Sequence, residues 1–486
     1  MIVELNNMET ILSIPTYRSQ QIAITVNTYA QNFKRFNHTV PIFVFDDSNE
    51  TQSKISEKCL LDLSKQLGNT QEINYVGPIQ KQLFLENLQK RFGQQNARNI
   101  GRIFKPSYGG NRNFSLVYTL GKTFISVDDD IVPAGLFTNQ YDTQLKEGIR
   151  PNIISKGSFM YEREIKHMKL VEQDVVKGYT KFLGTSVKDH SSKVRTGKRI
   201  SDPDVDSLGV TTGKLEDRVM KIVNGRISPE ARIKVVQTHL SGDADMDSAD
   251  LINLFVETGV GDILSGRLPK KYIIEKCREA ITFSNERLTG AVLGYDNSEG
   301  AIYFLPTNFR CEDFIWRVHL EKRLDIASAY TEHVQTHNRS LLVRESISQD
   351  WFNELIAQRL KRRIRDSIKN VGRFSMEFHT PYGVSLETAK DIKRRIEEKY
   401  NQATKKIKSN NKSSVNYQKF VQELEFILEN EIISPKKFAN KLTKVVLDEF
   451  SLFNKTAKIW PKILEYVSEM KEDLPILNLT KESLKN

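Results

Sequence analysis

The first 135 residues alternate between short apolar strand signals and helical periodicity, and this alternation restricts the chain to an α/β fold. Strand signals cover residues 10–15, 40–45, 72–76 and 122–127, and residues 21–36 carry apolar side chains at helical spacing. Apolar, β-branched runs of this kind are typical of parallel strands that helices cover on both faces. The pattern therefore predicts a Rossmann-like sheet sandwiched by helices.

Polar side chains follow three of these strands, at the point where each strand ends. Thr16 follows the first strand and Asp46-Asp47 the second, and a run of three aspartates from Asp128 to Asp130 follows the last. Ligands bind beyond the carboxyl ends of strands in doubly wound sheets, so these clusters predict a ligand site. Two carboxylates in a three-residue turn can hold a divalent cation against phosphate groups. The alternative is an acidic turn or helix cap, because such short motifs are common.

The segment over residues 109–130 (GGNRNFSLVYTLGKTFISVDDD) has a Gly-x-x-Arg-Asn helix start that leads to a strand ending in Asp-x-Asp. Together with IPTY at residues 14–17 and FDDS at residues 45–48, it resembles the family 2 glycosyltransferases and related enzymes with the GT-A fold. The resemblance covers residues 10–135 well and residues 289–337 more loosely. It implies a GT-A type mixed sheet with helices on both faces.

The resemblance also implies a nucleotide-sugar site built from particular residues. Thr16 and Asp46 would border the nucleobase, and Arg112 would lie beside the base. Asp128 would face the ribose, while Asp130 would hold Mn²⁺ or Mg²⁺, with Asp128 as a second metal ligand. An Asx-turn is the alternative role for Asp46, and a structural salt bridge is the alternative for Arg112. The remaining residues expected at the donor site are Pro15, Tyr17, Asp47 and Asp129.

An inverting sugar transfer needs a carboxylate that removes the proton of the acceptor hydroxyl. The resemblance places this base in a Glu-Asp pair at a helix start, downstream of a glycine-containing acceptor loop. Residues 289–295 and residues 311–316 (CEDFIW) fit that description. Asp313 is the expected base and Glu312 the second choice, although both carboxylates would also suit a helix cap.

Two histidines, His333 and His337, stand four residues apart and would share one face if the segment were helical. Several enzymes of the resembled class supply a C-terminal histidine as an extra metal or diphosphate ligand. We expect His337 to have this role, with Mn²⁺ favoured because Mg²⁺ prefers oxygen ligands. A surface histidine is the alternative.

The domain organisation predicted from these patterns has two parts. Apolar residues at helical spacing continue through the last third of the chain without a fixed repeat, which favours a helical bundle. The expected divisions are a GT-A domain over 1–345, with a donor-binding half at 1–135, an insertion at about 153–276 and an acceptor and catalytic part at 280–345, followed by a basic helical domain over 346–486.

Charge and cysteine content limit the environment and the partners. The net charge is +11, and the residues from Ser340 onwards hold 28 Lys and Arg against 20 Asp and Glu, so an acidic partner would suit this end. Three dispersed cysteines fit a reducing compartment, and no run of 18 apolar residues occurs. We expect a cytoplasmic protein, with peripheral contact at the inner face of a membrane and self-association through the C-terminal helices as further expectations.

The sequence therefore predicts a metal-dependent glycosyltransferase (EC 2.4 type) in glycan biosynthesis. It would move a sugar from a nucleotide-diphosphate sugar, with a UDP-sugar favoured, to a glycan, lipid-linked or protein hydroxyl. Inversion is the expected stereochemical outcome, and retention is the alternative. The second enzyme hypothesis is a sugar-1-phosphate nucleotidyltransferase, although the first strand lacks the glycine-rich phosphate loop that such enzymes carry. The non-enzymatic hypothesis is a binding protein that uses its basic helices, and without helix-turn-helix, RNP or zinc-finger patterns nucleic acid is not an expected partner.

Overall fold

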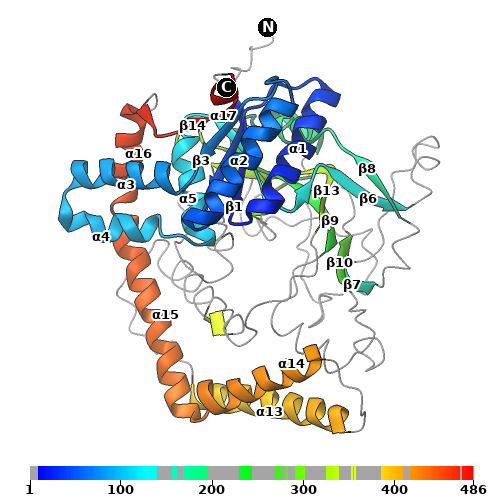
Figure 1. Cartoon of the computed structure of the whole chain (residues 1–486), viewed down its shortest axis with the longest axis vertical. Helices are drawn as coiled ribbons and strands as arrows, with labels where there is room; N and C mark the ends of the chain where they lie inside the picture. Colours follow the sequence, from blue (N-terminus) through cyan, green and yellow to red (C-terminus); the bar gives the residue numbers. More distant parts are fainter. Residues whose placement is uncertain are drawn as a thin grey trace.

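One mixed sheet organises the protein (Figure 1). The computed structural model describes residues 9–138, 156–160, 168–193, 229–243, 270–274, 280–282, 290–300, 313, 325–338, 352–353, 355–356, 385–408, 415–470 and 473–484. The described strands of this sheet run in the order β11-β13-β9-β12-β4-β1-β2-β3-β14, with β5, β7 and β10 paired beside this path. Glu312 and most of the expected insertion at 153–276 lie outside the described residues.

The N-terminal half of the sheet is parallel, as the sequence predicts. Its strands are β1 (Thr10–Thr16), β2 (Ile42–Asp46), β3 (Ile73–Val76) and β4 (Thr123–Val127). β1 pairs with β2 on one side and β4 on the other, and β2 pairs with β3, all in parallel. Because Thr16 is in register with Asp46, the strands end at one edge and bring their polar termini together.

The second half of the sheet is mainly antiparallel. β12 pairs antiparallel with both β4 and β9, whereas the long strand β13 pairs parallel with β9. The sheet is therefore mixed, and the predicted α/β class is confirmed. The strands of this half are β5 (Ile131–Val132), β7 (Lys156–Met160), β9 (Arg232–Asp243), β10 (Lys270–Ile274), β11 (Ala280–Thr282), β12 (Val292–Asp296) and β13 (Ile326–His337). A separate two-stranded antiparallel sheet consists of β6 (Ala134–Thr138) and β8 (Met168–Glu172).

Helices cover both faces of the parallel half, and two apolar cores result. One core joins α1 (Ser19–Phe36) and α2 (Glu50–Gln66) to the strands, with residues of α8 (Val175–Thr180). The other lies under α3 (Pro78–Phe92), α4 (Gln94–Ile103) and α5 (Tyr108–Tyr118). A 3₁₀ segment spans Val187–Lys193. Burial of apolar strand residues on both sides is the main stabilisation of this arrangement.

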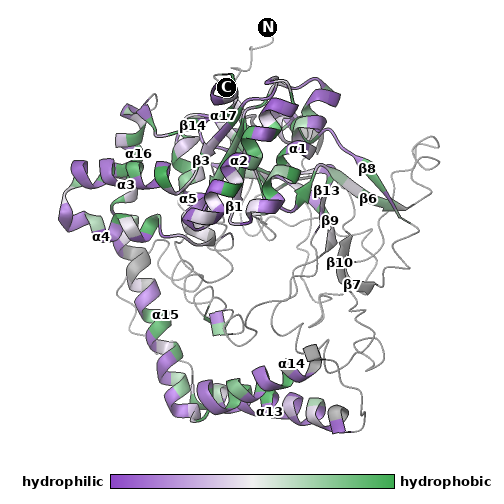
Figure 2. Ribbon diagram, in the orientation of Figure 1, coloured by the Kyte–Doolittle hydropathy of each residue, from purple (hydrophilic) through white to green (hydrophobic). Residues whose placement is uncertain are grey.

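The C-terminal helices leave the sheet and then return to it (Figure 1). α13 and α14 lie at the far end of the long helix α15, which connects them back to α4. Both α13 and α15 carry hydrophilic and hydrophobic residues along their length, as packing on one face requires (Figure 2). These helices are α13 (Leu386–Lys408), α14 (Val415–Phe426) with a π-helical turn over Ile427–Glu431, α15 (Pro435–Ala457) and α16 (Trp460–Glu469).

The last residues of the chain differ from the predicted all-helical C-terminal part. β14 (Leu477–Asn478) adds to the edge of the sheet beside β3, and α17 (Leu479–Ser483) packs on α2. The Thr480 hydroxyl accepts from the Ile73 amide at 2.9 Å and donates to the Gln71 carbonyl at 3.0 Å. A two-residue strand has too short a pattern to be read from sequence. Within the described ranges, no helix is both long and apolar enough to cross a bilayer.

Candidate functional site

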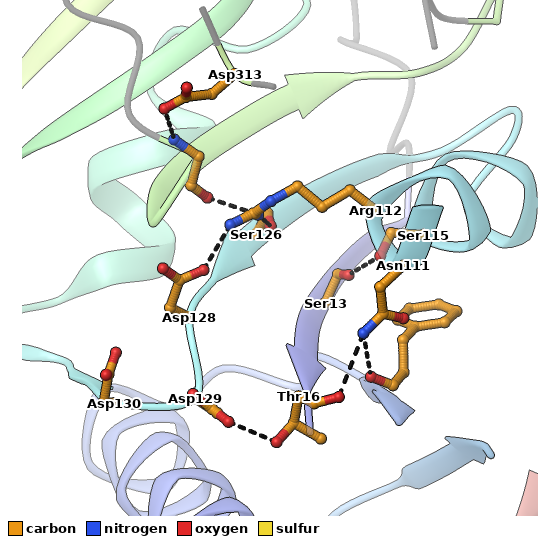
Figure 3. A network of polar contacts seen from close by, with 12 residues as sticks. Ser13, Thr16, Asn111, Arg112, Ser115, Ser126, Asp128, Asp129, Asp130 and Asp313 are labelled. Carbon is orange, nitrogen blue, oxygen red and sulfur yellow. Dashed lines mark hydrogen bonds and ion pairs between the residues drawn. The ribbon is translucent and has the colours of Figure 1, made fainter. Parts of the chain in front are cut away.

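Residues from three strands meet at the carboxyl edge of the parallel sheet (Figure 3). Thr16, at the end of β1, donates its hydroxyl to Asp129 Oδ2 at 2.5 Å, so the first strand is tied to the aspartate run after β4. Asp129 is also held through its backbone, because its carbonyl accepts from the Thr25 hydroxyl of α1. The predicted gathering of Thr16 and the aspartates at one edge is therefore seen in the structure.

The N-terminus of α5 carries the Gly-x-x-Arg-Asn motif into this edge. Ser107 caps the helix by accepting from the Gly110 amide at 3.0 Å, and a Cβ at Gly110 would lie 1.8 Å from the Lys105 carbonyl oxygen. Only glycine fits there. Asn111 then donates to the carbonyls of Thr16 at 3.3 Å and Phe45 at 2.9 Å, which joins the ends of β1 and β2.

Arg112 connects the helix to the aspartates and to a distant loop. Its Nη2 donates to Asp128 Oδ1 at 2.6 Å, and its Nη1 donates to the Ser126 hydroxyl at 3.0 Å and to the Gly290 carbonyl at 2.8 Å. The salt bridge that the sequence offered as an alternative role is present. It does not conflict with a ligand-binding role, because the Asp128 side chain is still 29% exposed.

The same loop brings Asp313 into the site. Asp313 Oδ2 accepts from the Gly290 amide at 3.1 Å, while the Gly290 carbonyl accepts from Arg112. Gly290 is closely packed, since a Cβ there would lie 3.0 Å from Arg112 Cζ. Asp313, Gly290, Arg112 and Asp128 thus form one continuous chain of hydrogen bonds, from the predicted base to a predicted donor contact (Figure 3).

The other two aspartates of the run are buried and share an arginine that sequence reasoning missed. Arg18 Nε donates to Asp129 Oδ2 at 3.1 Å, and its Nη2 contacts both Asp129 Oδ1 and Asp130 Oδ2, the latter at 2.8 Å. Burial raises the pKa of Asp129 to about 6, against the opposing effect of the Arg18 charge. The sequence feature that could have indicated Arg18 is its position directly after Pro15-Thr16-Tyr17, at the end of the first predicted strand.

His337 lies beside Asp130, as expected for a shared ligand site. His337 Nε2 is 2.9 Å from Asp130 Oδ1, and both side chains are buried. The segment is not helical, because both histidines are on strand β13, so the helical face considered for His333 and His337 does not exist. The ring of His333 instead lies against α8, where a Cβ at Gly178 would be 2.8 Å from its Cγ.

Two buried side chains of this edge are possible ligands for the predicted divalent cation. Asp130 and His337 offer an oxygen and a nitrogen of the kinds that bind Mn²⁺. Two protein ligands suffice only if a diphosphate supplies others, since no group of three His, Cys, Asp or Glu side chains with metal-binding arrangement occurs in the described part of the chain. Asp130 Oδ2 already accepts from Arg18, so a cation would compete with that arginine.

Asp46 and Asp47 are less accessible than the donor-site prediction requires. Asp46 has no exposed surface, and its carboxylate accepts from the Ser48 amide at 2.8 Å and from the Tyr75 hydroxyl at 2.9 Å. As placed, it cannot touch a nucleobase, so the Asx-turn alternative describes it better. Asp47 pairs with the buried Lys81 and accepts from the Ser107 amide at 3.2 Å.

No protein-family model and no curated protein matches the sequence. A crystal structure of S. aureus TarS 1–349 matches over 91% of each chain, with 11% sequence identity and a TM-score of 0.26. TarS is a glycosyltransferase, but so low a TM-score does not establish a common fold. Any functional assignment must therefore depend on the residues described above.

Proposed function

We propose that this protein is a glycosyltransferase that moves a sugar from a nucleotide-diphosphate donor, with a UDP-sugar favoured, to a hydroxyl acceptor. The observation that carries the proposal is the chain of hydrogen bonds that links Asp128 through Arg112 and Gly290 to Asp313. Two carboxylates 185 positions apart in sequence are thereby held at one sheet edge. One is suited to the donor and the other to the acceptor, as the GT-A resemblance requires.

The donor side of the site is formed by Tyr17 and Asp128. The Tyr17 ring is 57% exposed just beyond β1 and could stack on a nucleobase. The Asp128 carboxylate is partly exposed and can accept from a ribose hydroxyl. Both groups extend from the sheet edge where ligands of such folds bind.

The diphosphate leaving group requires positive charge, and two sources are proposed. The first is a divalent cation, Mn²⁺ or Mg²⁺, which would be held by Asp130, His337 and Asp128. When bound, it would act as a Lewis acid on the diphosphate. Arg112 supplies fixed positive charge next to Asp128. The protein's own part is to hold these groups in place and to limit their contact with water.

Asp313 is proposed as the general base of an inverting transfer. Its carboxylate would take the proton of the acceptor hydroxyl as that oxygen attacks the anomeric carbon and the nucleoside diphosphate leaves. The Gly290 amide holds Oδ2 of Asp313 at 3.1 Å and so orients the carboxylate relative to Arg112. Asp313 comes from a part of the sequence remote from the donor edge, as expected for a group that meets the second substrate.

The test is turnover of a panel of nucleotide sugars, UDP-sugars first, with Mn²⁺ or Mg²⁺. We expect nucleoside diphosphate release by the wild-type protein, and Asp313→Asn should reduce it about 100-fold or more while leaving the Kd for UDP within about threefold. Asp62→Asn, at an exposed position on α2, is the matched control and should keep full activity. Failure of every nucleotide sugar would refute the proposed function, and full activity of Asp313→Asn would refute the base assignment alone.

A further inference from the structure

Arg18 lies at the centre of the acidic cluster, where a metal ion would be expected. Its guanidinium contacts both oxygens of Asp129 and Oδ2 of Asp130, while the opposite oxygen of Asp130 faces His337 at 2.9 Å. The side chains of Asp129 and Asp130 are 3% and 1% exposed, so these ion pairs are shielded from water. Desolvated pairs of this kind are costly to break, because each partner is left as a buried unpaired charge.

Arg18 holds the two carboxylates differently. It contacts both oxygens of Asp129, whose Oδ2 also accepts from the Thr16 hydroxyl, whereas its contact with Asp130 is to Oδ2. Both aspartates are also held through their backbone carbonyls. A divalent cation and the guanidinium would therefore compete for Asp130.

The charge balance of the cluster also opposes separate binding of metal and diphosphate. Asp128, Asp129 and Asp130 face Arg18 and Arg112, which leaves one net negative charge when His337 is neutral. A free diphosphate is repelled by this charge, and a free cation must displace Arg18 from Asp130 without giving it a new acceptor. If both ligands arrive, the guanidinium can exchange the carboxylate oxygen for a phosphate oxygen.

We propose that Arg18 is an internal counter-cation that occupies Asp130 until a divalent ion replaces it, and that the released guanidinium then binds the donor's diphosphate. This inference rests on the proposed function and adds a regulatory property to the same site. Metal and nucleoside diphosphate bind with positive coupling, and each alone binds weakly. By linkage, UDP raises the affinity for Mn²⁺ by the same factor as Mn²⁺ raises the affinity for UDP.

The test is the affinity for Mn²⁺, measured by electron paramagnetic resonance of the free ion, with and without saturating UDP. In the wild-type protein UDP should tighten Mn²⁺ binding about 10-fold or more. Arg18→Met should tighten binding of Mn²⁺ alone about 10-fold, because the competitor is gone. The same substitution should reduce the coupling to about twofold or less, because a phosphate ligand is also lost.

Two further variants complete the experiment. Arg35→Met removes an exposed arginine of α1 that pairs with Glu172, and it should change neither affinity nor coupling. Arg18→Lys keeps the charge but lacks the planar fork that contacts both oxygens of Asp129 and one of Asp130, so an intermediate effect is expected. The lysine variant takes the place of Arg18→Met in the test if the methionine variant does not fold.

The possible outcomes distinguish failure of the Arg18 proposal from failure of the glycosyltransferase proposal. If wild-type protein binds UDP and Mn²⁺ without coupling, or if both Arg18 variants leave Mn²⁺ affinity unchanged, the counter-cation role is wrong while the glycosyltransferase proposal stands. If the wild-type protein binds neither UDP nor any other nucleoside diphosphate of the donor panel, with or without Mn²⁺, the proposed function fails and the role of Arg18 fails with it.

Discussion

Arg112 is the residue on which the geometry of the site depends most. It is 9% exposed at its side chain and donates to three acceptors, which come from β4, from the aspartate run and from the loop before β12. A planar guanidinium can serve acceptors in several directions at once, whereas an ammonium cannot hold the same geometry. The side chain therefore fixes where Asp128 stands relative to Gly290.

We predict that Arg112→Lys lowers the affinity for UDP about 10-fold or more and lowers the free energy of unfolding by about 2 kcal/mol, because charge-assisted bonds in a buried setting are lost. Calorimetric titration and urea unfolding would measure the two effects. The control is Arg35→Lys, at an exposed ion pair on α1, which should change neither quantity. An Arg112→Lys variant with wild-type UDP affinity would mean that this arginine does not position the donor site.

Two contacts at this scale show what a single sequence cannot predict. Arg18 meets Asp129 across 111 positions of sequence, and Gly290 meets Arg112 across 178. Neither contact has a local pattern, because both depend on how distant strands pair. By contrast, the aspartate run and Arg112 were predictable, since each belongs to a short motif next to a clear strand or helix start.

At the scale of secondary structure, a buried lysine joins three elements of the parallel half of the sheet. Lys81 of α3 pairs with Asp47 after β2 and donates to Asn111 Oδ1 of α5 at 2.7 Å, with its ammonium 4.9 Å from the centre of the Phe114 ring. Burial lowers the pKa of Lys81, although the Asp47 charge opposes this effect. The ends of β2 and α5 are thus fastened together behind the site.

We predict that Lys81→Met lowers the free energy of unfolding by about 3 kcal/mol, because Asp47 would be left as a largely buried, unpaired charge. The double variant Lys81→Met/Asp47→Asn should recover part of this loss. Urea unfolding of the wild-type protein, the two single variants and the double variant gives the coupling energy between Lys81 and Asp47. Lys54→Met, from an exposed pair with Glu50, should leave the free energy of unfolding almost unchanged. Equal effects of the two lysine substitutions would show that the Lys81 pair has no special structural role.

The elements themselves were predictable to different degrees. The apolar runs that became β1, β2 and β4, and the periodic helix α1, have strong local patterns, and the structure confirms them. The strand β13 was not predicted, and its two histidines were expected to share a face only for the case that the segment were helical. Its pairing with β9 is long-range and includes register shifts, so neither its type nor its partners follow from local spacing.

For the whole molecule, the C-terminal segment of the chain is joined to the N-terminal strands of the sheet. After helices α13 to α16, the strand β14 pairs with β3 at the edge of the sheet, and α17 packs on α2 and β3. Leu479 is 1% exposed and belongs to the same apolar core as α1 and α2. The parallel half of the sheet therefore gains stability from this C-terminal segment.

We predict that Leu479→Ala lowers the free energy of unfolding by about 2–4 kcal/mol, as expected for a buried leucine that leaves a cavity. Leu484→Ala, five residues further on at a side chain 70% exposed, should change stability by less than about 0.5 kcal/mol. Thermal or urea unfolding distinguishes the two. Similar, small effects of both substitutions would show that α17 does not stabilise the sheet.

The most direct measurement is a crystal structure of the protein with UDP and Mn²⁺. We expect the diphosphate at the carboxyl edge of β1 and β4, the ion bound by Asp130 and His337, and the Arg18 guanidinium moved from Asp130 to a phosphate oxygen. Electron density for UDP elsewhere on the protein, or none at saturating concentration with Arg18 still between Asp129 and Asp130, would contradict a nucleotide-sugar site at this edge.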